Sequence, residues 1–94
     1  MTITTRKVPC NYAAMTVIVI DGREVGFITK ISDSRSNMYP YAAYVGIGDD
    51  NRKIGHFYTS TQLAKLSPEN VTRDGLTGGG RQAAIDAVVA AATR

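Results

Sequence analysis

"TVIVIDGREVGFITK", Thr16 to Lys30, is the stretch that decides the fold of this chain. Its first five residues are all β-branched, and such side chains pack well on a pleated sheet, so they predict a strand. Asp21-Gly22 follows, a dipeptide that tolerates the positive φ angles of a two-residue type I′ turn. A returning strand comes next, and period-two alternation puts four of its residues on one face: Val25, Phe27, Thr29 and Ile31. The stretch therefore predicts a β-hairpin.

The same order of residue types returns in "DNRKIGHFYT", Asp50 to Thr59. "YAAYVGIG" (41–48) predicts the incoming strand of a second hairpin, with its turn at Asp49-Asp50-Asn51 and "RKIGHFYT" (52–59) as the outgoing strand. Gly26 and Gly55 hold the same place in the two copies. A glycine inside a strand either forms a bulge or lets another backbone come close. We interpret both glycines as room for a helix that packs across the sheet.

After Thr59 the sequence period becomes helical. Ser60 or Thr61 is expected to cap a short helix that runs to about Leu66. "TRDGLTGGG" (72–80) is typical of a flexible connector, and "RQAAIDAVVAAATR" (81–94) predicts a helix. One stripe of that helix is apolar at i, i+3, i+4 and i+7 spacing: Ala84, Ile85, Val88, Val89 and Ala92. The predicted fold is α+β, a four-stranded antiparallel sheet made of two hairpins, with one or two helices packed on one face.

Length and composition bound the class of protein. Ninety-four residues predict a single domain, 1–94, with an N-terminal segment (1–14), the two hairpins (15–59) and a helical part with the Gly-rich connector (60–94). One cysteine, Cys10, excludes an internal disulfide and a Cys-rich zinc site. No apolar run approaches the roughly 18 residues of a membrane helix, and no secretory signal is recognisable. We expect a cytoplasmic protein with no membrane partner.

The formal net charge is +3, and the cations are scattered and mostly interleaved with acids. Such a pattern is typical of a solvated surface. It also fits a modest basic patch that contacts a nucleic-acid backbone or an acidic partner.

Residues able to carry catalysis are few. His56 takes the place of Phe27 in the second copy of the repeat, so we interpret it as a half-buried strand residue that fills an aromatic slot. Asp49 and Asp50 are a pair of carboxylates, but a turn is the usual place for Asp. "LTGGGRQ" (76–82) precedes a helix, yet it lacks the preceding strand and the spacing of a phosphate-binding loop. We expect no catalytic residue, no metal and no cofactor.

"RSNMYPYAAY" (35–44) is the segment richest in interface residues. Tyrosine, methionine and arginine are enriched at macromolecular interfaces, because each offers contact area at low entropic cost. Ordinary sheet and loop tyrosines are the alternative interpretation. Turn and loop tips let a rigid sheet present contacts without disturbing its core. The predicted partner-binding residues therefore lie in this segment and at the end of the second hairpin: Arg35, Tyr39, Tyr41, Asp49, Asp50, Arg52 and Lys53.

Two family resemblances bear on function. "YAAYVGIGDDNRKIGHFYTSTQLA" resembles the sheet of AP2-type DNA-binding domains of integrases, although the chain lacks the tryptophan and the dense arginine ladder with which that family reads a major groove. The order of "NYAAMTVIVIDG", "KIGHFYTSTQL" and "DGLTGGGRQAAIDAVVAA" resembles small phage anti-CRISPR proteins of the type I-F class, in particular a member built from a four-stranded sheet and two helices. That family shares no catalytic residues. Its members bind the crRNA-guided surveillance complex and obstruct target DNA.

The residues and the second resemblance together favour a non-enzymatic binding protein, namely a phage-encoded inhibitor of a CRISPR-Cas surveillance complex. Its expected partner is a host protein or a ribonucleoprotein (Cas proteins with crRNA), with possible contacts to a nucleic-acid backbone. The alternatives are an AP2-like nucleic-acid-binding module and a small enzyme such as a hydrolase.

Overall fold

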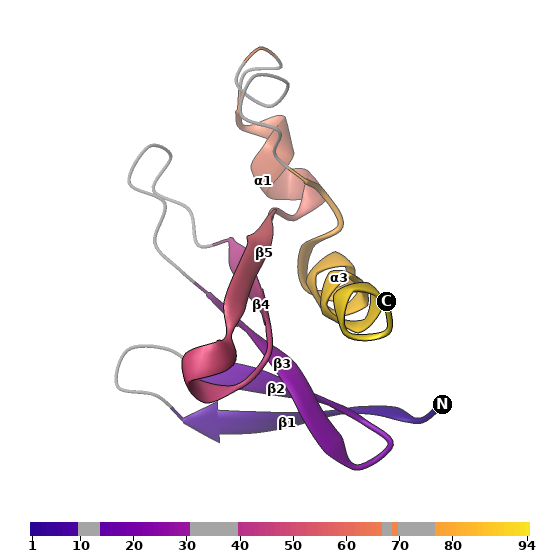
Figure 1. The fold of residues 1–94 in the computed structure, drawn as a ribbon. Helices are drawn as coiled ribbons and strands as arrows, with labels where there is room; N and C mark the ends of the chain where they lie inside the picture. Colours follow the sequence, from indigo (N-terminus) through magenta and orange to yellow (C-terminus); the bar gives the residue numbers. More distant parts are fainter. Residues whose placement is uncertain (10–13, 31–39, 67–68, 70–76) are drawn as a thin grey trace.

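Among the residues that the structure describes, the sheet has five strands, each antiparallel to its neighbours, in the order β1-β2-β3-β4-β5 (Figure 1). The structure is a computed structural model and describes residues 1–9, 14–30, 40–66, 69 and 77–94. The strands are β1 (Ile3–Pro9), β2 (Ala14–Ile20), β3 (Arg23–Lys30), β4 (Tyr41–Val45) and β5 (Arg52–Phe57). Helix α3 (Gly80–Ala92) packs on one face, and a short helix α1 (Ser60–Ala64) follows β5. No helix in these ranges is long and apolar enough to cross a membrane.

The prediction of an α+β fold is confirmed, but the prediction of four strands is wrong. The additional strand is β1, which lies inside the segment 1–14 that showed no pattern in the sequence. Every residue of β1 is exposed except Val8, which is half-buried. A strand that buries neither face needs no alternation of apolar and polar residues, so period-two reasoning could not find it.

The predicted type I′ turn between β2 and β3 is confirmed. Asp21 has a φ of 50° and Gly22 a φ of 82°, and Ile20 pairs directly with Arg23 across the turn. The Asp21 backbone N–H donates to the Thr2 carbonyl at 2.9 Å, and the Thr2 N–H donates to the Asp21 carboxylate at 2.8 Å. The turn therefore also anchors the start of β1.

Both copies of the repeated phrase form a β-bulge at the same position. In the first copy the register passes from Ile18–Gly26 to Val19–Glu24, which leaves Val25 as the extra residue. In the second copy the register passes from Ala43–Gly55 to Tyr44–Lys53, which leaves Ile54 as the extra residue. The repeat thus encodes a bulge at the β-branched residue before each glycine.

The bulge overturns the predicted face of β3. Val25 is buried in the core beneath α3, but the next core residue along the strand is Ile28. Phe27 and Thr29 lie on the opposite face, where Phe27 stacks on Tyr44 with ring centroids 4.6 Å apart. An extra residue in a strand shifts the alternation by one, so strict period two fails across it.

The interpretation of the two glycines holds for one of them. A Cβ on Gly26 would lie 2.4 Å from the Tyr44 carbonyl oxygen and 2.6 Å from a Val88 methyl of α3. A Cβ on Gly55 would meet no atom within 4 Å. Close approach of the helix therefore requires Gly26, whereas Gly55 needs no such room.

The second hairpin has a wider turn than the first. Strand β4 ends at Val45 rather than at Gly48, and residues Gly48–Asp50 form a short 3₁₀ turn, η1, before β5 begins at Arg52. Gly46 and Gly48 have φ angles of 91° and 69°, which glycine adopts without steric cost. The connection therefore presents η1 and the first residues of β5 as a tip at one end of the sheet.

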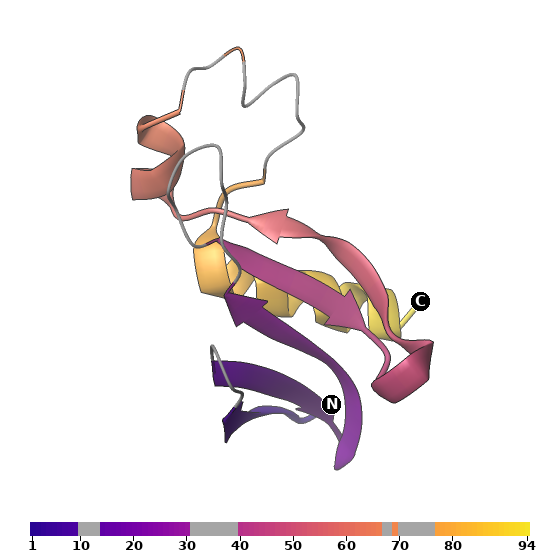
Figure 2. The same cartoon turned by 90° about the vertical axis from the view of Figure 1, so that its left-hand side faces the viewer.

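Helix α3 covers strands β3 to β5, and in Figure 2 it lies behind the sheet. The predicted stripe is confirmed: Ala84, Ile85 and Val88 are buried, and Val89 and Ala92 pack against them at the margin. The core that they complete on the sheet side is built from apolar residues of four strands: Ile18, Val25, Ile28, Ala43 and Phe57.

The return of the chain from β5 to α3 is hydrogen-bonded. The Tyr58 N–H donates to the Thr77 carbonyl at 2.8 Å, and the Gly80 N–H donates to the Tyr58 carbonyl at 2.9 Å. Helix α1 begins from Thr59, one residue before the predicted cap, where Thr59 and Gln62 form a reciprocal capping box. The described end of the Gly-rich connector is therefore fixed beside the end of β5.

Candidate functional site

The tip of the β4–β5 hairpin brings together four of the predicted contact residues. Asp49 and Asp50 lie in η1, Arg52 and Lys53 are the first residues of β5, and all four are exposed. The β4–β5 ladder, which holds both strands beneath α3, also holds this tip. All four residues therefore lie at this tip, but Arg52 and Lys53 are neighbours in one strand and point to opposite faces of the sheet.

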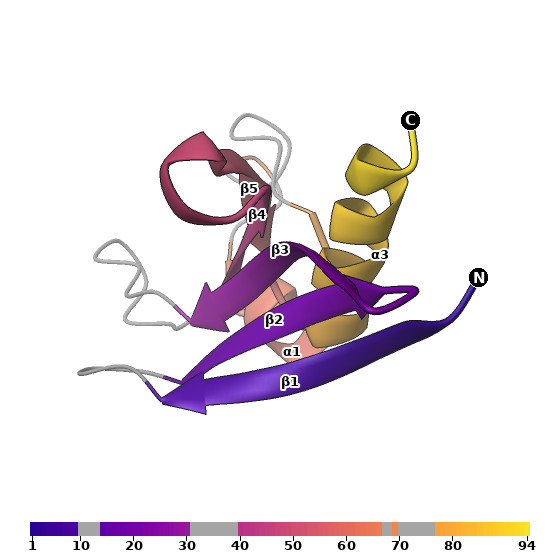
Figure 3. The ribbon, with the colours of Figure 1, turned by 60° about the horizontal axis from the view of Figure 1, so that its bottom comes forward.

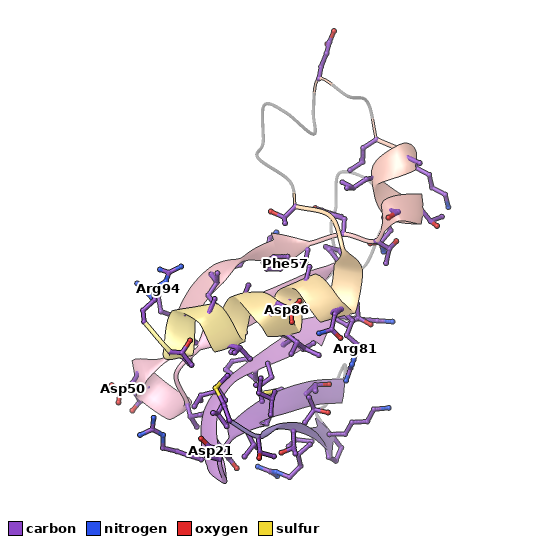
Figure 4. All side chains as sticks on the ribbon, turned by 90° about the vertical axis from the view of Figure 1, so that its right-hand side faces the viewer. Asp21, Asp50, Phe57, Arg81, Asp86 and Arg94 are labelled. Carbon is purple, nitrogen blue, oxygen red and sulfur yellow. The ribbon has the colours of Figure 1, made fainter. Side chains whose placement is uncertain are left out.

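Arg94, two residues beyond the end of helix α3, is a further residue at this tip that was not predicted. The helix starts beside the end of β5, because Gly80 is hydrogen-bonded to Tyr58. Its 13 residues span about 20 Å at 1.5 Å per residue, and the six residues of β5 span about 20 Å at 3.3 Å per residue. The end of the helix therefore returns to the start of β5, and Figure 4 shows Arg94 at the same end of the molecule as Asp50.

A pocket of about 210 Å³ lies between this end of α3 and the start of β5, lined by Arg52, Lys53, Ile54, Ala91 and Arg94. Three of the five lining residues are cations, and none is an acid. Ala91 contributes to the volume of the pocket, because its small side chain leaves room between α3 and β5. We call Asp49, Asp50, Arg52, Lys53 and Arg94 the turn-end cluster.

The cations of the turn-end cluster are available for a ligand. No salt bridge joins Arg52, Lys53 or Arg94 to another residue in the described ranges. Arg6 differs, because its guanidinium forms a salt bridge with Glu24 across β2. Exposed charges that have no intramolecular partner lose little on binding an anion, since no existing contact has to be broken.

The other predicted contact residues are not part of this cluster. Tyr41 is half-buried on the α3 side of the sheet, where it packs against the core and lies under the Lys30 ammonium, 5.5 Å from the ring centroid. It pairs with Phe57, at the opposite end of β4 from η1. Arg35 and Tyr39 lie outside the described residues.

Arg94 and Ala91 could be found from the sequence only through the lengths of two elements. A helix of about 13 residues and a strand of six have nearly equal lengths, so an antiparallel arrangement returns the helix end to the strand start. The sequence predicts a helix of about this length, but its predicted strand, 52–59, is two residues longer than β5, and it does not state that the helix begins beside the end of β5. That depends on the hydrogen bond between Gly80 and Tyr58.

His56 lies on the sheet face opposite α3, paired with Ala42, and is half-buried as predicted. Across the part of the chain that the structure describes, no three His, Cys, Asp or Glu side chains are grouped so that they could hold a metal ion. The chemistry that this arrangement offers is the binding of anions by exposed cations, next to a separate pair of carboxylates. No family model, curated protein or solved structure is significantly similar to the chain.

Proposed function

We propose that this protein is a non-enzymatic binding protein, a phage-encoded inhibitor that uses its turn-end cluster to bind a crRNA-guided CRISPR-Cas surveillance complex and block recognition of target DNA. The observation that carries the proposal is the pocket with three cations, Arg52, Lys53 and Arg94, beside the two exposed carboxylates of η1. The class of partner, a crRNA-guided complex, is inferred from the resemblance in sequence order to type I-F anti-CRISPR proteins.

The mixture of charges fits a ribonucleoprotein better than a bare nucleic acid. Guanidinium and ammonium groups pair with the phosphates of an RNA backbone. Asp49 and Asp50 repel those phosphates, but they attract the lysines and arginines with which a protein holds its RNA. A surface that carries both signs side by side therefore favours the boundary between RNA and protein, where both complementary charges occur.

To block the DNA-binding site of the complex, the inhibitor needs no catalytic chemistry. It needs only affinity for the complex and enough volume to fill the site. The hairpin end is held by the β4–β5 ladder and by α3, so the backbone that carries the cluster loses little conformational entropy on binding, and the cost is confined to ordering the side chains. The sheet and helix behind it then occupy the space that duplex DNA would need.

The test is binding to a purified type I-F surveillance complex, measured with immobilised complex and with displacement of a fluorescent target duplex. We expect Arg52→Ala with Lys53→Ala to weaken binding at least tenfold, because central charged contacts typically cost about 2 kcal/mol or more when removed. The matched control is Arg23→Ala with Lys65→Ala, which removes the same charge from exposed residues elsewhere and should leave the affinity within about twofold. Unchanged affinity in the first variant would overturn the assignment of the site.

The carboxylates give a second, opposite test. Asp49→Asn with Asp50→Asn should weaken binding to the complex while strengthening binding to a bare single-stranded RNA oligonucleotide. Removal of both cation contacts should also flatten the salt dependence for that RNA by about 1.4 in log–log slope, two contacts at about 0.7 each. If the Asn variant bound the complex more tightly, the partner surface would be RNA alone.

An AP2-like DNA-binding module is the second candidate, and one observation favours it. Strands β3 to β5 form a three-stranded antiparallel sheet with α3 across one face, and no described helix lies over the opposite face. The AP2 resemblance implies that this opposite face would read DNA. Sub-micromolar, sequence-dependent binding to naked duplex DNA at physiological salt would support this candidate and exclude the inhibitor, for which we expect no more than the non-specific ~10⁻⁴–10⁻⁶ M.

A further inference from the structure

Strand β1 is an edge of the sheet, and no element of the described ranges covers its outer side. Figure 3 shows it along the outer side, and its described contacts are concentrated on β2. No residue of β1 belongs to the hydrophobic core, and Ile3 is 42% exposed. Seven residues of ordered strand that bury almost nothing in the monomer provide a template for pairing with another strand.

The hydrogen bonds at the turn show which backbone groups of β1 are free. Because Asp21 donates to the Thr2 carbonyl, Thr2 faces β2. Backbone groups of an antiparallel strand alternate in direction, so Thr4, Arg6 and Val8 also face β2. The opposite set points to the outer edge: Ile3, Thr5, Lys7 and Pro9. Pro9, which has no N–H, thus lies where an edge strand tolerates proline.

We propose that this edge pairs with the β1 edge of a second copy of the chain, antiparallel, about a two-fold axis that passes through Thr5. In this register Thr5 pairs with Thr5 of the second copy, and Ile3 pairs with Lys7. Each N–H of the outward set then meets a carbonyl of the other copy, which makes six backbone hydrogen bonds. Pro9 falls opposite Met1, outside these six bonds, so its missing N–H removes none of them.

Hydrogen bonding and charge together favour this register over its neighbours. An axis at Thr4 would pair only Ile3 and Thr5 among the outward residues of β1, which gives four backbone hydrogen bonds in place of six. Moving the axis to Lys7 would set two ammonium groups directly opposite each other, and moving it to Arg6 would do the same with two guanidinium groups; directly opposed like charges destabilise a sheet. With the axis at Thr5, Lys7 lies opposite Ile3, and the two Lys7 residues are offset by four residues, about 13 Å along the strands. That distance exceeds the screening length of about 8 Å at physiological salt. The two Arg6 residues are offset by only two residues, about 7 Å, but each is paired with Glu24 of its own copy.

The occupant is a second copy because the edge is complementary to itself. A foreign strand would have to match an edge of three donors and four acceptors that ends in proline. The β1 edge of a second copy matches it by symmetry, with a threonine pair at the centre, which is a favourable cross-strand combination. The product is one continuous ten-stranded sheet with both α3 helices on the same side. The turn-end clusters lie at β4–β5, away from the shared edge, and remain free.

Hydrogen exchange tests the proposal residue by residue. As the concentration of protein rises, the amides of Ile3, Thr5 and Lys7 should become protected, whereas those of Thr4, Arg6 and Val8 are protected at every concentration because they face β2. In parallel, sedimentation should show the mass rising from 10.1 kDa to twice that value. A monomer up to about 1 mM, the limit of very weak association, would overturn the proposal.

Thr5→Pro is the sharpest variant, because it removes an N–H that points to solvent in the monomer. The strand keeps its bonds to β2, and we expect self-association to fall at least tenfold. The matched control, Thr5→Val, keeps the N–H and should associate like the wild type. If the Thr5→Pro variant had the melting temperature of the wild-type monomer and still dimerised as strongly as wild type, the dimer would use another surface. That result would overturn the proposal.

Cross-linking tests the register without relying on a proline. In a Cys10→Ser background, Thr5→Cys should form an intermolecular disulfide on mild oxidation, because a hydrogen-bonded pair holds its Cα atoms about 5.5 Å apart. Ile3→Cys is the control, since its two copies are about 13 Å apart along the strands in this register. Equal cross-linking of both variants, or of neither, would contradict an axis at Thr5.

Discussion

Gly26 and Gly55 show how one residue type in one repeated phrase serves two different purposes. Each follows a bulged β-branched residue, and neither has a positive φ angle. Gly26 lies beneath Val88 and against the carbonyl of Tyr44, so a hydrogen in place of a methyl group is what allows α3 to approach. Gly55 lies nearer the edge of the sheet, where the space above it is empty.

Gly26→Ala should therefore destabilise the fold by about 1–3 kcal/mol, because the new methyl group would force apart backbone and helix. Gly55→Ala is the matched control, and its free energy of unfolding should lie within about 0.5 kcal/mol of wild type. Urea denaturation followed by circular dichroism measures both. Equal losses in the two variants would mean that the cost comes from the bulge and not from the helix.

The first hairpin owes its turn to backbone conformation and not to space. A Cβ on Gly22 would meet nothing within 4 Å, but the φ of 82° is one that L-residues seldom adopt. The second copy of the phrase has Asn51 at the corresponding place, and there the chain forms η1 and a wider turn. The first connection has two residues between its paired strand ends, whereas the second has six, residues 46–51, and this longer connection forms the tip that carries the turn-end cluster.

Gly22→Ala should cost about 1–2 kcal/mol, the penalty for an L-residue in the left-handed region. Gly22→Asn should cost less, since asparagine tolerates positive φ better than alanine. Thermal melts of the two variants beside wild type give the comparison. If the alanine variant were no less stable than the asparagine variant, packing and not conformation would control this turn.

At the scale of the whole molecule, α3 is the second layer that the sheet needs. Ile85 is 6% exposed, and it completes a core with Ile18 and Ile28 of the sheet. The same helix carries Arg94 to the start of β5, so the element that stabilises the fold also completes the turn-end cluster.

Ile85→Ala should lower the free energy of unfolding by about 2–5 kcal/mol, the range for truncating a buried aliphatic side chain. Ile47→Ala is the control, because Ile47 is 39% exposed and touches no part of the core cluster. It should change stability by less than about 0.5 kcal/mol. Denaturant titration measures both variants, and a small effect of Ile85→Ala would show that the sheet is stable without its helical layer.

The sequence by itself determined the α+β class, the Asp21-Gly22 turn, the apolar stripe of α3 and the exposed charges at the second turn. Each depends on residues close in the chain, whose propensity or period is local. Only the tertiary structure decided the face on which Phe27 lies, the different roles of Gly26 and Gly55, the existence of β1 and the arrival of Arg94 beside Arg52. These depend on a register shifted by a bulge, on pairing with a strand that buries nothing, and on where a helix begins relative to a strand. These features depend on how separate elements pack and pair, so they cannot be predicted from any short segment of the sequence.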